Sequence, residues 1–308
     1  MTERTDSLLS RQNRPDMMAL LHAMSVCHSR AQRLDNLRMV LSIAIGIVGA
    51  VVAFIGVSAV AVTAVGALWA VVNAIGLASW STGQLRRAAT LQEMFDVRLF
   101  ELPWNTVAAG EPLGAEEVSR LDRAYRGDER YLRDYYEVPP LPRPYDVLAC
   151  QQQNLGWGAR VRRRYAYGVL GGVALWTAVG VVFAVTADLT VANLLTQWFV
   201  PSLGALLLGV EIYRGQRDVA IERYRALGIV HRRLTAAVRR GDDSSAVPDL
   251  LTLARQTQDL IFQSRQAQAR VPDWFFRRFH AADRVDFQAA MMNLGDLLST
   301  RPPAAHVD

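Results

Sequence analysis

The chain has 308 residues with 34 basic and 29 acidic side chains, which gives a formal net charge of +5, and 51% of its residues are hydrophobic. That apolar content excludes a disordered chain, and the uncharged stretches 39–85, 165–187 and 189–210 exclude a purely soluble globular protein. Every basic residue is an arginine, so a Walker A phosphate loop and a Schiff-base lysine are also excluded.

The chain is predicted to begin with a cytoplasmic amino-terminal helix within residues 1–38. The uncharged run that follows, 39–85, would be about 70 Å long as a single helix, roughly twice the thickness of a bilayer. We therefore predict that residues 39–80 form a hairpin of two transmembrane helices, 39–56 and 59–80, with the turn near residues 56–58.

A cytoplasmic helical module is predicted for residues 81–164. Good helix formers continue the second span outward as far as Pro103, and a short charged helix is predicted at 115–126. The proline-rich stretch 138–144 is typical of a stiff, extended linker. A further helix, 145–164, is expected to lead into the next apolar run.

A second transmembrane hairpin is predicted for residues 165–210, divided at Asp188, the one charged residue between Arg164 and Glu211. Residues 211–308 are predicted to form a cytoplasmic carboxy-terminal region. Its expected helices are 211–239, 248–270 and 283–298, separated by a loop at residues 241–243 and by the segment 271–274. Because no convincing period-two pattern occurs, the predicted fold class is all-α: a polytopic membrane protein with four transmembrane helices in two hairpins and cytoplasmic helical extensions.

Arginines next to the helix ends predict the orientation, since positive flanks stay on the cytoplasmic side. Both hairpin turns lack arginine, so both termini and the middle module are expected in the cytoplasm. A nucleic-acid patch would require basic residues interleaved with aromatic ones on a soluble face, and we expect no DNA or RNA polymer as a partner. The flanking arginines are Arg30, Arg33, Arg38, Arg86, Arg87, Arg160, Arg162, Arg163, Arg164, Arg214, Arg217, Arg223 and Arg225.

A cluster of polar side chains is predicted on the two helices that leave the membrane. Glu93 and Gln153 each lie 11 residues from a predicted membrane boundary, which places both about 16 Å above the surface if the helices continue. Two sets of polar residues would then face each other as a site for a soluble ligand, with a solvated or mutually capped helix face as the alternative. These sets are Gln92, Glu93 and Asp96 on one helix and Gln151, Gln152 and Asn154 on the other.

Three arginines near this cluster, Arg86, Arg87 and Arg160, are the predicted donors to a phosphate group.

Within the membrane, a face with four-residue spacing on the fourth span is predicted either to line a conducting path or to pack against other helices. Pro201 is also a possible flexing point. This face of the fourth span comprises Asn193, Gln197, Pro201, Ala205 and Gly209. Asn73 in the second span and Thr177 in the third are additional polar candidates for the same role.

Catalytic motifs are missing from the sequence: it contains neither Gly-x-Ser-x-Gly nor His-Glu-x-x-His. His22, Cys27 and His28 are near one another, but without further ligands they do not predict a metal site. We therefore expect no enzyme, no cofactor and no metal. The two cysteines, Cys27 and Cys150, stand in no paired motif and fit a reducing compartment.

Several segments in chain order resemble one known family. They are Arg11-Gln12-Asn13; Gln92-Glu93-Met94-Phe95-Asp96 with Leu102-Pro103-Trp104-Asn105; Cys150-Gln151 with Asn154-Leu155-Gly156-Trp157 and 160–165; and Gln258-Asp259-Leu260-Ile261-Phe262, Arg265 and 271–275. Together they resemble the SMODS-associated four-transmembrane family of pore-forming effectors, over nearly the whole chain. The chain departs from the family pattern at Gln152, Gln153 and Gly158, where the family often carries charged residues.

The resemblance implies a role in bacterial defence against phage. A nucleotidyltransferase, encoded nearby, would make a cyclic oligonucleotide on infection, and the effector would sense it and disrupt the inner membrane. Independently of the resemblance, we expect a homo-oligomer, because one four-helix unit has too little interior for a wide channel. The alternative is a non-conducting membrane sensor or scaffold that recruits a partner through its cytoplasmic helices, which the lack of charges within the spans favours. A lipid-cleaving membrane enzyme is disfavoured by the missing nucleophile motif.

Overall fold

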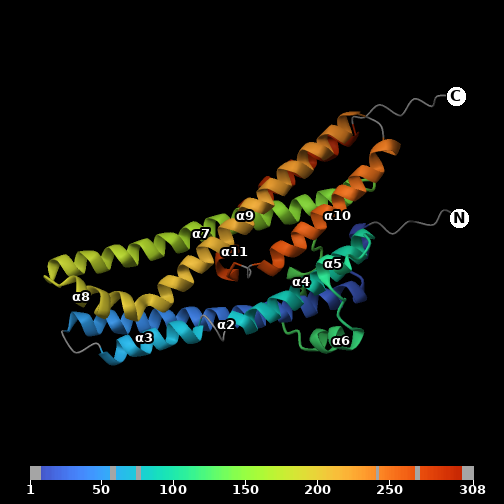
Figure 1. Ribbon diagram of the computed structural model, residues 1–308. Coiled ribbons are helices and arrows are strands. Elements are labelled where there is room, and N and C mark those ends of the chain that lie inside the picture. The colour runs from blue at the N-terminus through green and yellow to red at the C-terminus, as the bar shows by residue number, and fades with distance from the viewer. Residues whose placement is uncertain (1–7, 56–59, 74–77, 241–242, 268–270, 300–308) are drawn as a thin grey trace, which may run out of the picture. The chain divides into compact units, whose positions relative to one another are not determined.

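The computed structural model describes residues 8–55, 60–73, 78–240, 243–267 and 271–299, and within these ranges it contains helices and no strand. The predicted all-α class is therefore confirmed (Figure 1). The chain divides into two compact units. Unit 1 comprises Met1–His28, Arg86–Val161 and Val219–Asp308, and unit 2 comprises Ser29–Leu85 and Arg162–Asp218.

Long helices account for most of both units. Four of them, α2, α4, α7 and α9, contribute residues to unit 1 and to unit 2. The α-helices are α1 (Leu8–Arg11), α2 (Pro15–Phe54), α3 (Val60–Val72), α4 (Ala78–Phe100), α5 (Thr106–Ala109), α6 (Ala115–Arg123), α7 (Tyr145–Thr186), α8 (Val191–Leu194), α9 (Val200–Arg240), α10 (Asp243–Ala267) and α11 (Asp273–Ser299).

Unit 1 has a continuous apolar core, to which the helices contribute fully buried aromatic and aliphatic side chains. Burying each large side chain stabilises the fold by about 1.5–3 kcal/mol. Among the largest are Leu20, Leu21 and Met24 of α2, Leu91, Phe95 and Phe100 of α4, Leu148 and Leu155 of α7, and Leu234, Ile261 and Phe262 from α9 and α10.

The segment after α4 turns sharply because of its sequence. Pro103 follows the end of the helix, and Asn105 caps α5 by accepting a hydrogen bond from the backbone N–H of Ala108 at 3.2 Å. Gly110 ends α5 with a positive φ of 68°, which glycine adopts without strain. The indole of Trp104 donates to the Gly110 carbonyl at 2.9 Å and closes this turn.

Unit 2 contains the apolar runs. Three helices in the described residues are long and apolar enough to cross a membrane, in the ranges Pro15–Val52, Tyr145–Thr186 and Val191–Arg239, and Val60–Val72 is a shorter apolar helix. The shorter helix occupies the position of the predicted second span, whose remainder includes residues 74–77, outside the described residues. The predicted turn at 56–58 also lies outside them.

The surface of unit 2 is strongly apolar along individual helices. On α2 the exposed residues Val40, Ile43, Ile47, Val51 and Phe54 recur every three or four positions and form one stripe. Exposed valines and leucines continue in the same way along α3 and α7. Such stripes on uncharged helices are typical of lipid-facing surfaces.

The helices of unit 2 pack closely around Pro201. A Cβ atom added at Gly49 would lie 2.3 Å from the Pro201 Cβ, and one added at Gly66 would lie 2.8 Å from the Pro201 Cα. Trp176 and Trp198 stack with ring centroids 4.9 Å apart. Since Pro201 has no N–H to donate, the helix is π-helical over Leu195–Phe199 just before it.

The helices α10 and α11 both begin earlier than the sequence predicted. The helix α10 begins at Asp243 and contains Pro248 as its sixth residue, so the helix continues through a position that cannot donate an intrahelical hydrogen bond. The helix α11 begins at Asp273, ten residues before the predicted start at position 283. Asp273 follows Pro272, whose carbonyl accepts the first hydrogen bonds of this helix.

Candidate functional site

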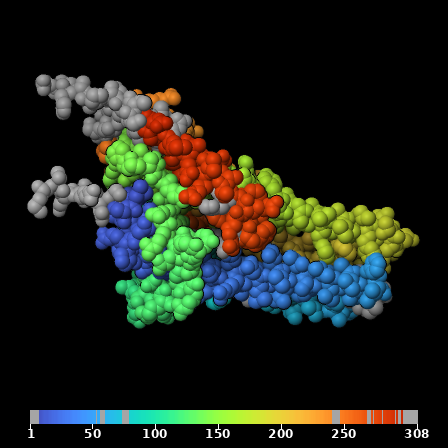
Figure 2. Space-filling view, turned by 180° about the vertical axis from the view of Figure 1, so that it is seen from behind, coloured from blue at the N-terminus to red at the C-terminus, as the bar shows by residue number. Residues whose placement is uncertain are grey.

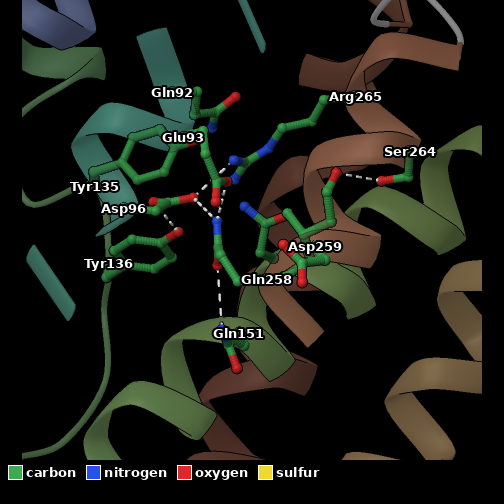
Figure 3. Close-up of polar contacts among 12 residues, drawn as sticks. Gln92, Glu93, Asp96, Tyr135, Tyr136, Gln151, Gln258, Asp259, Ser264 and Arg265 are labelled. Atoms are coloured by element: carbon green, nitrogen blue, oxygen red, sulfur yellow. Dashed lines mark hydrogen bonds and ion pairs between the residues drawn. The ribbon is translucent and has the colours of Figure 1, made fainter. Parts of the chain in front are cut away.

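A buried network of charged and polar side chains lies inside unit 1 (Figure 3). Glu93 and Asp96 come from α4, three residues apart and therefore on the same face of the helix. Four side chains of α10 join them: Arg255, Gln258, Asp259 and Arg265. Gln151 of α7 and Tyr136, from the segment between α6 and α7, complete the network. We call these eight residues the ionic cluster.

Gln258 lies at the centre of the ionic cluster. Its amide nitrogen donates to Glu93 Oε2 at 2.7 Å and to Asp96 Oδ2 at 3.0 Å, and its amide oxygen accepts from Gln151 Nε2 at 3.2 Å. Gln258 and Gln151 are both fully buried. One uncharged amide thus links three helices, and its donor and acceptor groups are both in use.

Two ion pairs flank this central amide. The Arg255 Nη2 atom lies 2.7 Å from Glu93 Oε1 and 2.8 Å from Asp259 Oδ1, and the Arg265 Nη1 atom lies 2.7 Å from Asp96 Oδ2. The Tyr136 hydroxyl donates to the other oxygen of Asp96 at 2.7 Å. The ionic cluster therefore contains three carboxyl groups and two guanidinium groups, of which Glu93, Asp96 and Arg265 are buried.

Burial dominates the electrostatics of the cluster. It raises the pKa of Glu93, although hydrogen bonds from Arg255 and Gln258 oppose that effect. Burial also raises the pKa of Tyr136 well above its usual range, and the Asp96 charge adds to the rise. For Arg265, burial lowers the pKa but the neighbouring Asp96 outweighs it, so the pKa is raised and the guanidinium stays charged.

The guanidinium of Arg265 is incompletely satisfied. Its side chain is only 5% exposed, yet among the described residues neither Nη1 nor Nη2 has a hydrogen-bond partner of good geometry. A buried donor without a partner costs about 1–3 kcal/mol, and more for a charged group. Arg265 is thus a buried cation with spare donors.

The cluster also extends to the turn after α4. Asn105 Nδ2 donates to Asp259 Oδ2 at 3.1 Å, and Arg255 Nη1 donates to the Pro103 carbonyl at 2.9 Å. These contacts attach α10 to the turn at 103–105 as well as to α4 itself. A shift of α10 would therefore change its contacts both with the carboxyl-terminal part of α4 and with the turn at 103–105.

The structure brings together only some of the residues that the sequence predicted for the ligand site. Glu93, Asp96 and Gln151 lie in the ionic cluster, and Gln92 bonds to the Tyr135 hydroxyl beside it. Asn154 instead accepts hydrogen bonds from Arg223 Nη1, at 3.1 Å on its carbonyl and 3.3 Å on its side chain.

The three predicted phosphate donors lie elsewhere. Arg160 pairs with two carboxylates of α11, Asp283 at 3.0 Å and Asp286 at 2.7 Å. Arg87 is half exposed and lies 3.5 Å from Glu117, and Arg86 is exposed. The ion pairs of Arg87 and Arg160 are therefore made outside the ionic cluster.

Two positions where the chain departs from the family pattern have structural uses. Gln153 accepts a hydrogen bond from the backbone N–H of Glu137 at 2.9 Å. A Cβ atom at Gly158 would lie 2.1 Å from Arg223 Nη1, so the missing side chain leaves room for that guanidinium.

In unit 2, the residues predicted to line a path or to pack against helices divide by environment. Pro201 and Gly209 are buried in helix contacts, the latter against Val173. Asn73 accepts a hydrogen bond from Arg38 Nε at 2.7 Å, and both residues are buried. The Thr177 hydroxyl bonds to its own helix, Asn193 is exposed, and Gln197 and Ala205 are half-buried.

Sequence reasoning missed Arg255 and Tyr136 and assigned no role to Gln258 or Arg265. A signal was present for the last two, because Gln258 and Arg265 are seven residues apart on one helix, two turns along the same face. Within the described residues, no three histidine, cysteine or acidic side chains form a group that could hold a metal ion.

A cavity of about 330 Å³ lies between α9 and α10 of unit 1. Its polar lining residues include Arg233, Asp249, Thr252 and Gln256. The helix α10 therefore borders this cavity and also carries the four cluster residues from Arg255 to Arg265.

The fold and this site define an all-helical membrane protein with a buried ion-pair network and no recognisable catalytic motif. Residues 6–294 match the family described as the SMODS-associating 4TM effector domain, and the chain belongs to that family. It is also 22% identical over 277 residues to a probable CBASS effector molecule of Bacillus cereus (strain VD146), covering 87% of this chain and 92% of that protein. No solved structure matches the chain significantly.

Proposed function

We propose that the protein is a defence effector that permeabilises the bacterial inner membrane when it binds a cyclic oligonucleotide. The family and the relative's description as a probable CBASS effector support the defence role. In such a system a partner nucleotidyltransferase, encoded nearby, makes the nucleotide on phage infection. The apolar stripes of unit 2 support action on a lipid bilayer.

The proposed topology has both termini, residues 81–164 and residues 211–308 in the cytoplasm, with hairpins 39–80 and 165–210 in the inner membrane. The arginines that flank the apolar runs support this orientation, because translocating them across a bilayer is unfavourable. The amino-terminal helix within residues 1–38 then lies on the same side. The ionic cluster would face the compartment in which the nucleotide is made.

The observation that carries the sensing role is the ionic cluster with the unsatisfied Arg265. A phosphate group is a strong bidentate partner for a guanidinium and would compete with Asp96 for it. Because Gln258 joins both carboxylates of α4 to Gln151 of α7, loss of the Asp96–Arg265 pair would weaken the α4–α7–α10 connection. Since α4 and α7 also contribute to unit 2, a change in the cluster would be transmitted along helices that enter the membrane.

A ligand can drive this change only through different affinities for the two states. Moving a population from 1:99 to 99:1 requires a preference of about 10⁴-fold, or about 5.5 kcal/mol. Assembly into a homo-oligomer would multiply the effect of each bound nucleotide. An oligomer is also needed for a wide path, because the helices around Pro201 pack without space for a side chain at Gly49 or Gly66. The protein acts in this scheme without catalysing a reaction and without a cofactor.

Dye release from vesicles tests the proposal. Purified protein in dye-filled vesicles is challenged with a panel of cyclic di- and trinucleotides, and one of them should release the dye. Arg265→Gln should abolish the response while the protein still inserts, whereas Arg130→Gln should respond normally because Arg130 is exposed and pairs locally with Asp128. Arg160→Gln tests whether Arg160, which the sequence predicted as a phosphate donor, also contributes to the response.

A second function is favoured by one observation: apart from Asp188, no charged residue lies within the predicted spans 165–210, and none lies within 39–80. A non-conducting membrane sensor that recruits a partner would need no ion path. It predicts nucleotide-dependent capture of a partner and no dye release from any ligand. Appearance of lipid cleavage products would instead identify an enzyme and refute both proposals.

A further inference from the structure

The first two turns of α11 have an unusual composition, Trp274-Phe275-Phe276-Arg277-Arg278-Phe279. We call residues 274–279 the aromatic turn. Trp274 is 66% exposed, and Arg277 and Arg278 are exposed as well. Phe275 contacts both Trp274 and Phe279, with centroids 5.6 and 5.2 Å apart. The ionic cluster does not include any of these residues.

The helix α11 is attached to α7 by contacts that fix its direction. Trp157 of α7 meets Phe287 of α11 edge to face at 6.0 Å, and three residues further along α7, Arg160 pairs with Asp283. Residue numbers therefore rise along α7 while they fall along α11, so the two helices are antiparallel. In Figure 2, α11 (red) lies on the outer surface of unit 1.

Distances along the helices place the aromatic turn near the start of the apolar run. Arg160 precedes Tyr165, the first residue of that run, by five residues, or about 8 Å. Trp274 precedes Asp283 by nine residues, so it extends about 14 Å from the Arg160 contact toward the same end. This length is greater than the distance along α7 from Arg160 to the first residue of the apolar run.

We infer that the aromatic turn of α11 anchors unit 1 to the membrane by binding the anionic headgroup region of the lipid bilayer. Tryptophan and phenylalanine rings lie favourably at the membrane–water boundary. Each arginine near an anionic surface is attracted to the lipid headgroups. Two neighbouring cations and three phenylalanines beside an exposed tryptophan fit that boundary better than they fit water. This inference requires only that α7 spans the membrane, and it is independent of pore formation and nucleotide sensing.

Depth measurements with spin labels test the anchor in the full chain. Trp274→Cys and Met292→Cys are compared, since both positions are exposed on α11 and lie 18 residues apart, about 27 Å along the helix. The native Cys27 and Cys150 are buried and do not compete for the label. The proteins are reconstituted in vesicles of phosphatidylethanolamine and phosphatidylglycerol, or of phosphatidylcholine alone.

The label at position 274 should be more accessible to oxygen than to a water-soluble nickel complex, and the label at position 292 should show the reverse. Replacing both arginines, Arg277→Gln with Arg278→Gln, should move the label at 274 toward water in phosphatidylglycerol vesicles. If Trp274→Cys fails to fold, Arg278→Cys serves as the probe. An aqueous environment at the aromatic turn, equal to that at position 292 in both lipids, would overturn the inference.

Discussion

Replacing Asp96 by asparagine removes the charge that faces Arg265 in the core of unit 1. Asp96 is fully buried and the Arg265 side chain is 5% exposed, so water cannot replace the lost partner. Removing one member of a buried pair costs about 3–5 kcal/mol because the other charge stays buried. For a folding unit of this size, that corresponds to a fall in melting temperature of about 6–20 °C.

A double variant distinguishes the effect of the lost charge on stability from the effect of the altered side-chain shape. Asp96→Asn combined with Arg265→Met removes both charges of the buried pair together, so it should recover most of the lost stability. Arg87→Met is the control, because Arg87 is half exposed, lies 3.5 Å from Glu117, and should cost less than about 1 kcal/mol. The assay is thermal melting of the detergent-purified proteins, followed by circular dichroism. The reasoning fails if Asp96→Asn melts within about 2 °C of the parent, or if the double variant loses the sum of both single effects.

Three other outcomes follow from the structure. Burial raises the pKa of the Tyr136 hydroxyl, so the neutral hydroxyl stabilises the folded protein below about pH 10 and this stabilisation is lost as the pH rises. Tyr136→Phe should therefore show a smaller fall in melting temperature at alkaline pH than the parent protein. Burial likewise raises the pKa of Cys150, whose thiol should resist Ellman's reagent at neutral pH until the protein is denatured. Gly49→Ala should destabilise the protein by about 1–3 kcal/mol in thermal melts, because its Cβ would overlap Pro201, whereas Gly171→Ala meets no atom within 4 Å and should not.

The long helices were predictable from the sequence because the periodicity and the absence of charge are properties of local stretches. The uncharged runs and proline positions predicted helices at α2, α4, α7 and α9, and the structure confirms an all-helical membrane fold. The second span is the exception: the described helix at Val60–Val72 is short, and residues 74–77 lie outside the described part. Glu93 and Gln151, which the sequence predicted to face one another, both bond to Gln258.

The partners of the cluster depend on tertiary packing, which height alone does not specify. Arg160 follows Gln151 by nine residues, which is about 180° around the helix, so it faces α11 and not α4. Arg86 shares the face of Glu93 but lies about 10 Å along the helix from it. The cations that do meet the carboxylates, Arg255 and Arg265, come from α10, more than 160 residues further along the chain. Only a three-dimensional arrangement, or recognition of the family segments as one set, could have brought that helix to the site.

Unit 1 is assembled from three separate stretches of chain, with the two apolar regions encoded between them. During translation, Glu93 and Gln151 leave the ribosome well before Arg255, Gln258 and Arg265. At about 5–20 residues per second, the carboxyl-terminal stretch is completed several seconds after the last apolar helix. Insertion into the bilayer can therefore precede formation of the ion-pair network. A prematurely terminated chain would remain in the membrane with Glu93 and Asp96 lacking the arginines of α10 that neutralise them.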